Sequence, residues 1–418
     1  MKKKVVIIGQ GFTGRLSIVR SIADFDCEIT LIVLTFRRAK DGSLNEIKPI
    51  DAYSKYVSCT LYCETHNSEM LINTLLTKCV DPAQKTIIFP DNDFSAAAID
   101  DHFDILKEHF YCPNINKEQG AIVKWMDKAR QKDLAQDVGL NVTNSTIIEI
   151  TDGRFVIPDS IEYPCFTKPL VSMLGAKLGI KRCNNRGELE KHLTQLPTLH
   201  KRFRNSKLLV EDFKKIDREF AVLGFSDGNE VVIPGIIEII NLAHGRRFGV
   251  AVQGKVYPIE DYTLIEKFSD LIKRIGFVGI FDIDYYESGG LLYFGEINLR
   301  FGGSGYAYTK TGVNLPVMMI KSFLGVSIHD MNQVITNSAT FFNENMAMED
   351  WFSGYMCTKE FEQIRKESDI LFVYDENDPA PQKEFEKVFR KKHLKKIINQ
   401  FRKFSKSLLE KVIFTKNQ

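Results

Sequence analysis

The sequence is poor in the residues that mark several protein classes. Its 418 residues include only 13 Pro, 27 Gly and 8 Cys, and the cysteines form no C-x-x-C pair. So little proline and glycine excludes collagen-like and low-complexity chains, and 44% hydrophobic residues exclude a wholly disordered one. The scattered cysteines predict reduced thiols in a cytoplasmic protein.

Excess charge and long apolar runs are equally scarce. The formal net charge is +2, from 56 basic and 54 acidic side chains, so the global charge predicts no nucleic-acid partner. No apolar run approaches the ~18–20 residues of a membrane span. The apolar stretch 5–8 is shorter than the roughly 7–15 residues of a signal peptide. At roughly 150 residues per domain, we expect two to four globular domains.

The first 113 residues alternate strand and helix patterns. Apolar strands at 5–8, 29–34 and 86–89 are separated by helical patterns, which predicts βαβ units and a parallel sheet.

A glycine motif, Gly9-x-Gly11-x-x-Gly14, joins the first of these strands to the first helix with the spacing of a dinucleotide fingerprint. The acidic residue expected roughly 20 positions on is absent, because the second strand runs into Arg37 and Arg38. We therefore expect a structural turn in which Gly11 can touch substrate. A nicotinamide-dependent oxidoreductase is the less favoured alternative.

The strongest chemical pattern lies on a strand near residue 296. We expect a helix from about 118 to 139, followed by short, mainly antiparallel strands. One of these strands carries Glu296, Asn298 and Arg300. Period two places these three side chains on one face. Magnesium prefers oxygen ligands such as those of Glu and Asn, and the planar guanidinium of arginine suits a phosphoryl oxygen.

The preceding strand supplies a matching set of acids. Asp282 and Asp284 alternate along it, and the turn Ser288-Gly289-Gly290 predicts a hairpin. If the hairpin closes through these three residues, both carboxylates share the face of Glu296. Carboxylates that converge in this way need a cation, and the alternative is an exposed sheet face on which water solvates them.

The hairpin, E-x-N-x-R and the following Gly302-Gly303-Ser304-Gly305 resemble the catalytic end of the ATP-grasp superfamily. The chain is most similar to carboxylate–amine ligases of the D-aspartate ligase type and to the carbamoyl-phosphate synthase large subunit. The resemblance implies an α/β and α+β protein. Its parts would be a Rossmann-like domain (1–113), an ATP-grasp domain (114–330) with a lid at about 150–215 and a C-terminal antiparallel sheet, and a C-terminal extension (331–418).

The resemblance also implies a role for each matching residue. ATP would be bound by Lys128, Lys168, Glu211, Phe213 and Glu219. Magnesium or manganese would be held by Asp284, Glu296 and Asn298, with Asp282 a rival for the first position. Arg300 and Lys168 would be catalytic. The implied reaction is ligation, in which Mg-ATP phosphorylates a carboxylate and an amine then displaces the phosphate.

Several alternatives stay open. Arg246 and Arg247 could clamp a carboxylate substrate or form a solvated turn. Residues 91–93 end a strand, where α/β sheets place ligands, but they serve equally well as a helix cap. A non-catalytic nucleotide-binding or scaffold protein with the same fold is the main alternative to an enzyme.

The C-terminus is basic. Residues 390–416 contain ten Lys or Arg against one acid, Glu410, and apolar residues recur at spacings of three and four. This pattern predicts a basic amphipathic helix, which suits an anionic membrane surface and a ligase of cell-envelope or polysaccharide precursors. The alternative, which we favour because a chain of this size has ample surface, is packing on the protein's own body or on a second copy in a homodimer.

Overall fold

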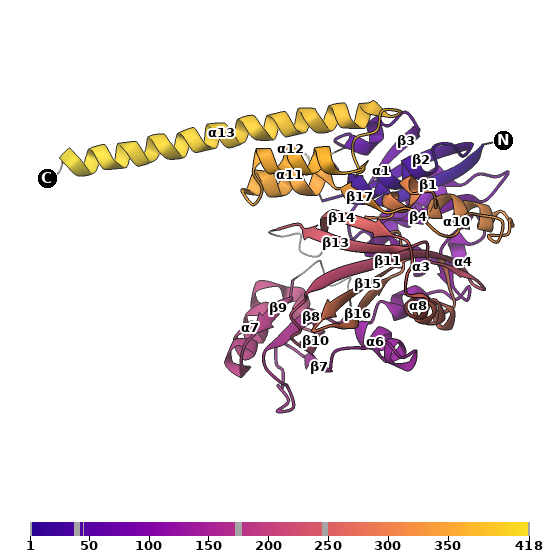
Figure 1. The fold of residues 1–418 in the computed structure, drawn as a ribbon, viewed down its shortest axis with the longest axis horizontal. Helices are drawn as coiled ribbons and strands as arrows, with labels where there is room; N and C mark the ends of the chain where they lie inside the picture. Colours follow the sequence, from indigo (N-terminus) through magenta and orange to yellow (C-terminus); the bar gives the residue numbers. More distant parts are fainter. Residues whose placement is uncertain (1, 37–41, 45, 172–177, 245–249, 417–418) are drawn as a thin grey trace.

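The computed structural model describes residues 2–36, 42–44, 46–171, 178–244 and 250–416, with side chains up to residue 398. Three β-sheets form the body. In Figure 1 a five-stranded sheet and a four-stranded sheet lie at opposite ends, and a nine-stranded sheet lies between them.

The N-terminal sheet is parallel throughout, in the order β3-β2-β1-β4-β5. Its strands are β1 (Lys3–Gly9), β2 (Cys27–Thr35), β3 (Val57–Glu64), β4 (Thr86–Pro90) and β5 (Phe110–Tyr111). Its helices are α1 (Phe12–Ser21), α2 (Ser68–Thr74), α3 (Asp93–Asp100) and α4 (Phe103–Leu106). Alternate β1 residues enter different cores, because Val5 packs with the central sheet and Val6 packs with α2 and α3.

The four-stranded sheet is antiparallel, in the order β7-β10-β8-β9, and all of it except β7 lies in the segment 150–215 expected to form the lid. Its elements are β7 (Ser145–Ile150), β8 (Cys165–Pro169), β9 (Lys181–Cys183), α7 (Arg186–Leu199) and β10 (Ser206–Asp212). It has its own small core, in which Leu189 and Leu193 of α7 pack on Leu208 and Val210 of β10.

The central sheet runs β16-β15-β11-β13-β14-β17-β18, with β12 beside β11 and β6 beside β15. Its strands are β6 (Asn114–Ile115), β11 (Arg218–Asp227), β12 (Val231–Val232), β13 (Ile236–Leu242), β14 (Ala251–Tyr257), β15 (Phe277–Ser288), β16 (Leu291–Asn298), β17 (Ala339–Phe342) and β18 (Ile370–Leu371). The accompanying helices are α5 (Ala121–Trp125), α6 (Lys128–Asp137), α8 (Tyr262–Ile275), α9 (Tyr306–Lys310) and α10 (Leu315–Phe323).

The expected single helix over 118–139 is wrong, because the chain breaks it into α5 and α6. Asp127 interrupts the helix and caps α6, its side chain accepting from the backbone N–H groups of Ala129 and Arg130. Lys128 is therefore the first residue of α6 and follows the capping residue Asp127.

The β15–β16 hairpin places the expected acids on one face, but by another route. Its turn contains two residues, Gly289 and Gly290, both with positive φ, where three had been expected. Such a turn alone would pair Asp284 with Gly295. A bulge at Gly295 shifts the register, so that Asp284 pairs with Glu296. Glycine is required there, since a Cβ would come within 2.8 Å of the Asp284 carbonyl oxygen.

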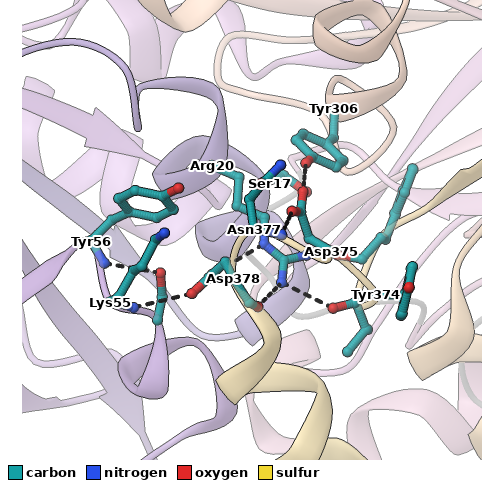
Figure 2. A network of polar contacts seen from close by, with 12 residues as sticks. Ser17, Arg20, Lys55, Tyr56, Tyr306, Tyr374, Asp375, Asn377 and Asp378 are labelled. Atoms are coloured by element: carbon teal, nitrogen blue, oxygen red, sulfur yellow. Dashed lines mark hydrogen bonds and ion pairs between the residues drawn. The ribbon is translucent and has the colours of Figure 1, made fainter.

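The C-terminal extension is fastened to the N-terminal domain through a buried arginine (Figure 2). Arg20 donates to the carbonyl oxygens of Phe372 and Val373, both at 3.0 Å, and pairs with the carboxylate of Asp378 at 3.3 Å. The Lys55 backbone N–H donates to the same carboxylate at 3.1 Å. The extension thus forms part of the body, and its strands β17 and β18 lengthen the central sheet.

Beyond these strands come α11 (Glu344–Ser353), α12 (Thr358–Glu367) and the long α13 (Pro379–Lys416). The start of α13 packs on α11, where the rings of Phe389 and Trp351 lie 4.7 Å apart. Figure 1 shows the rest of α13 extending as one helix past α11 and α12. Of the helices that the structure describes, none combines the length and hydropathy needed to cross a bilayer.

Candidate active site

Acidic and amide side chains gather on one face of the β15–β16 hairpin. The register pairs Asp284 with Glu296 and Asp282 with Asn298, so all four side chains face the same way. The Asn298 amide donates to Asp284 Oδ2 at 3.3 Å. The face predicted from period two is therefore present, and both Asp282 and Asp284 belong to it.

The carboxyl groups of this face differ in pKa. Burial and the neighbouring Asp282 and Glu296 raise the pKa of Asp284 well above its ordinary value. Burial also raises the pKa of Asp282, to about 6, against the opposing effect of Arg300. For Glu296 burial acts in the same direction, but the Lys128 ion pair, Lys168 and Arg300 outweigh it and lower the pKa to about 2.

This set suits a divalent cation. Asp282 Oδ1 is buried and, among the described residues, has no hydrogen-bond partner. Two crowded carboxyl groups with raised pKa values would ionise readily beside a cation. In the described part of the chain, no three His, Cys, Asp or Glu side chains already form a ready-made metal cluster. The donors instead fit magnesium, which is usually held by one or two carboxylates and completes its shell with phosphates and water.

β16 ends at Asn298, so Arg300 lies just beyond the strand on which it was expected, among carboxylates from two distant parts of the chain. Its Nε lies 3.0 Å from Asp93 Oδ1, and one terminal nitrogen lies 3.6 Å from Asp282 Oδ2. Burial would lower the pKa of Arg300, but Asp93, Asp282 and Asp91 raise it overall. Asp93 begins α3, which Asn92 caps in a reciprocal pair with Ser95. The segment 91–93 therefore serves both as a helix cap and as part of the site.

Two lysines expected to contact ATP lie in separate ion pairs, one with the hairpin and one within the four-stranded sheet. Lys128 Nζ lies 2.5 Å from Glu296 Oε2, and Lys168 Nζ lies 2.9 Å from Glu211 Oε2. The Lys128 side chain is only 9% exposed. Its pKa is raised, because Glu296, Asp93 and Asp284 outweigh the effect of burial.

Phe213 and Glu219 lie at the two ends of the segment that joins the lid to the central sheet. Phe213 follows β10, and its ring is covered by the Arg182 guanidinium, 4.1 Å from the ring centroid. Glu219 lies on β11 opposite Tyr286 of β15, diagonal to Asp284 on the same face. Its charge contributes to the raised pKa of Asp284.

The glycine motif holds a carboxylate. A Cβ at Gly9 would lie 2.6 Å from Asp91 Oδ2, and one at Gly14 would overlap Asp91 Oδ1. Burial raises the pKa of Asp91 to about 7, against Arg15 and Arg300. Because the acid lies where a dinucleotide would bring its pyrophosphate, the geometry counts against the nicotinamide alternative. Gly11 itself faces open space among the described residues.

Two expected substrate residues, Arg246 and Arg247, lie outside the described residues. Lys132 was not predicted as part of the site, whereas Asp91 and Asp93 belong to the segment 91–93 that the sequence left open between a ligand site and a helix cap. Lys132 Nζ lies 2.7 Å from Glu211 Oε1. It stands one helical turn after Lys128, and that i, i+4 spacing was the available signal.

Known proteins share this architecture. No protein-family model matches the chain. The carbamoyl phosphate synthase large chain of Neisseria meningitidis serogroup B is 24% identical over 213 residues, which cover 49% of this chain but 19% of that protein. The structure of an L-amino acid ligase from Bacillus licheniformis matches with a TM-score of 0.57 at 17% identity, over 81% of this chain and 79% of that one. The chain has the ATP-grasp fold.

A second solved structure agrees. The biotin carboxylase domain of the Hydrogenobacter thermophilus 2-oxoglutarate carboxylase, in complex with magnesium ADP and bicarbonate, has a TM-score of 0.60 at 18% identity. The match covers 81% of this chain and 74% of that domain. The expected fold class, with its parallel N-terminal sheet and antiparallel sheets, is thereby confirmed.

Proposed function

We propose that the protein is an ATP- and magnesium-dependent ligase that activates a carboxylate as an acyl phosphate and joins it to an amine, releasing ADP. One observation carries the proposal: Asp284, Glu296 and Asn298 share a face, and Arg300 lies at its end. A protein that used this fold merely as a scaffold would have no need to bury these charges together, because doing so is costly. The ADP complex of one structural neighbour and the ligase name of another support it.

Each residue of the site then has a task. A bound Mg²⁺ or Mn²⁺ would neutralise charge on the ATP phosphates, and Asp284, Glu296 and Asn298 would hold it, with Asp282 close by. Lys128 would bind phosphate oxygens from α6, and Lys168 would bind them from β8. Phe213 would lie against adenine, and Glu219 would accept from the ribose hydroxyls.

Arg300 would act on the transferring phosphoryl group. Its guanidinium is held by Asp93 and Asp282, so its charge is in place before the group moves. Such preorganised charge stabilises the transition state without reorganisation during the reaction. The carboxylate oxygen attacks the γ-phosphorus, ADP leaves, and the amine nitrogen then attacks the acyl carbon as phosphate leaves.

An ADP-release assay tests the proposal. The purified protein is incubated with Mg-ATP and a matrix of carboxylates and amines, and ligated products are identified by mass spectrometry. We expect ADP release that requires one carboxylate–amine pair, with a product lighter than the two substrates by one water. ATP binding without ADP release under any pair would favour the scaffold alternative. Binding of a nicotinamide dinucleotide in place of ATP would favour the oxidoreductase.

We also propose that this cytoplasmic ligase contacts a membrane surface through α13. The helix extends past α11 and α12 (Figure 1), which disfavours packing of its apolar residues on the protein's own body and leaves a second copy as the alternative partner. Near residue 398, where the described side chains end, Leu394 and Ile398 are exposed and lie close to lysines in the sequence. Apolar side chains on a basic helix suit an anionic bilayer. Such contact would fit a substrate from cell-envelope or polysaccharide biosynthesis.

A further inference from the structure

Lys132 is a buried ammonium group one turn after Lys128 on α6. Its side chain is 4% exposed, and its Nζ donates to Glu211 Oε1 at 2.7 Å and to Thr143 Oγ1 at 2.8 Å. The i, i+4 spacing places both lysines on one face of the helix. Helix α6 therefore offers one lysine to the acidic hairpin and another to the lid.

Glu211 consequently forms ion pairs with two lysines. Lys132 of α6 pairs with Oε1, and Lys168 of the neighbouring strand β8 pairs with Oε2 at 2.9 Å. Burial would raise the pKa of Glu211, but the two lysines outweigh it and lower the pKa, so the group is a carboxylate. The three side chains together carry one positive charge.

Nucleotide binding creates a conflict at Lys168, which the proposed function assigns to a phosphate. A lysine that moves from a buried carboxylate to a phosphate leaves the carboxylate without a counter-ion. Breaking a buried ion pair in this way is strongly unfavourable. A second lysine already bound to the carboxylate removes the conflict, because the charge stays paired.

We propose that Lys132 is a positioning residue that keeps Glu211 paired while Lys168 moves from Glu211 to a nucleotide phosphate. This inference rests on the proposed function. In the resting site Glu211 is shared by two lysines. In the loaded site Lys132 and Glu211 form a neutral pair, and the released charge of Lys168 lies on the phosphate. Only ion pairs are exchanged, and no covalent bond changes.

Lys132 could instead be a mere tether between α6 and the lid. The two roles differ in what they do to phosphate binding. A tether would affect every ligand of the site through the shape of the lid. A counter-ion that releases Lys168 affects ligands that carry phosphate, and the effect depends on the charge of Glu211.

Titration calorimetry with Mg-ATP and with adenosine, which lacks phosphate, distinguishes the counter-ion role of Lys132 from the tether role. We expect K132M to bind ATP at least about tenfold more weakly than the wild type and adenosine equally well, because Lys168 remains with Glu211. The double variant K132M/E211Q removes the competing charge and should bind ATP within about threefold of E211Q, the reference that carries the same change at Glu211. K132R, which keeps the charge, should stay near wild type. K267M is the matched control, since Lys267 is an exposed lysine that donates to Gly139 O at 2.8 Å.

Equal ATP affinity of K132M and the wild type would overturn the inference and leave the proposed function intact. So would equal losses for ATP and adenosine, or a double variant no better than the single one. A wild-type protein that binds no ATP would overturn the inference and the proposed function together. If K132M does not fold, K132M/E211Q is compared with E211Q, in which Lys168 is already free of the carboxylate: equal ATP affinities support the inference, and weaker ATP and adenosine binding by the double variant refutes it in favour of a tether.

Discussion

Arg300 of the central sheet and Asp93 of the N-terminal domain form an ion pair, with Nε 3.0 Å from Oδ1. The pair joins two parts of the chain that are 207 positions apart. It fixes the guanidinium beside the acidic face of the hairpin, because its other arm reaches Asp282. The N-terminal domain therefore helps to build the site.

This relationship predicts that R300K loses ligase activity while the protein still folds and binds ATP. Lysine keeps the positive charge among the carboxylates, so their mutual repulsion stays compensated, but it lacks the planar fork. We expect ADP release to fall by at least about 100-fold, the order of loss seen when a single transition-state donor is removed. Wild-type turnover in R300K would remove Arg300 from the mechanism. R274K, at an exposed arginine of α8, is the control.

Removal of one charged ligand should abolish the magnesium dependence of ATP binding. E296Q replaces a carboxylate of the acidic face with an amide of the same shape. We expect Mg²⁺ to strengthen ATP binding in the wild type and to have little effect in E296Q, because neutral oxygens hold Mg²⁺ weakly. Calorimetry in Mg²⁺ and in EDTA measures the difference. E287Q, near the turn of the same hairpin, should behave like the wild type. An unchanged Mg²⁺ effect in E296Q would place the metal elsewhere.

Period two on a single strand was enough to predict the acidic face, since Glu296 and Asn298 share it whatever the turn does. The turn itself was predicted with one residue too many. The face was still right because the bulge at Gly295 compensates, and a bulge leaves little trace in one sequence. Lys132 was missed because a lysine on a helix is usually solvated, and only the fold brings β10 against it. Asp91 was considered as a ligand or a cap, whereas its contact with Gly9 and Gly14 depends on the parallel order of β1 and β4.

The contact between Asp91 and the glycine motif predicts a pair of compensating substitutions. G14A should destabilise the protein by about 1–3 kcal/mol, the usual cost of overpacking, because its methyl group overlaps Asp91 Oδ1. G14A/D91A should recover most of that loss. G11A should cost no more than about 1 kcal/mol, the order of an unfavourable N-cap residue. Urea unfolding gives the three values. Equal losses for G14A and G11A would contradict this account of the motif.

Asp100 predicts a pH dependence of stability. Burial raises its pKa from 3.8 to about 6, although the backbone N–H groups of Val123 and Ile122 oppose this. Between pH 6 and 4 the folded protein holds a proton that the unfolded chain has not yet bound, so this group makes the protein more stable as pH falls.

D100N keeps the oxygen that accepts from Val123 but never carries the charge. We therefore expect it to be more stable than the wild type by about 1 kcal/mol at pH 7, with the gain disappearing near pH 4. Urea unfolding at several pH values measures this. D101N, at the exposed neighbour, should show no pH-dependent difference from the wild type. A constant difference for D100N across the range would refute the assignment.

The distal part of α13 predicts salt-sensitive binding to anionic vesicles. Its basic residues attract a negative surface, and its apolar residues would enter the headgroup region. We expect the full chain to sediment with phosphatidylserine vesicles at low salt, to be released as salt rises, and to ignore phosphatidylcholine vesicles. The charge variant R402E/K403E/K406E/K411E keeps the helix and its apolar residues but should not sediment.

Truncation after Ile398 gives the second arm, because it keeps the segment of α13 that packs on Trp351. The truncated chain should fold, release ADP like the full chain and remain in the supernatant. The apolar residues of the distal part of α13 could instead pair with a second copy of the chain. In that case the full chain will be a dimer in analytical ultracentrifugation and will not bind vesicles, and the truncated chain will be a monomer. Equal sedimentation of the full and truncated chains would place any membrane contact outside residues 399–416, since the distal charges would then contribute nothing.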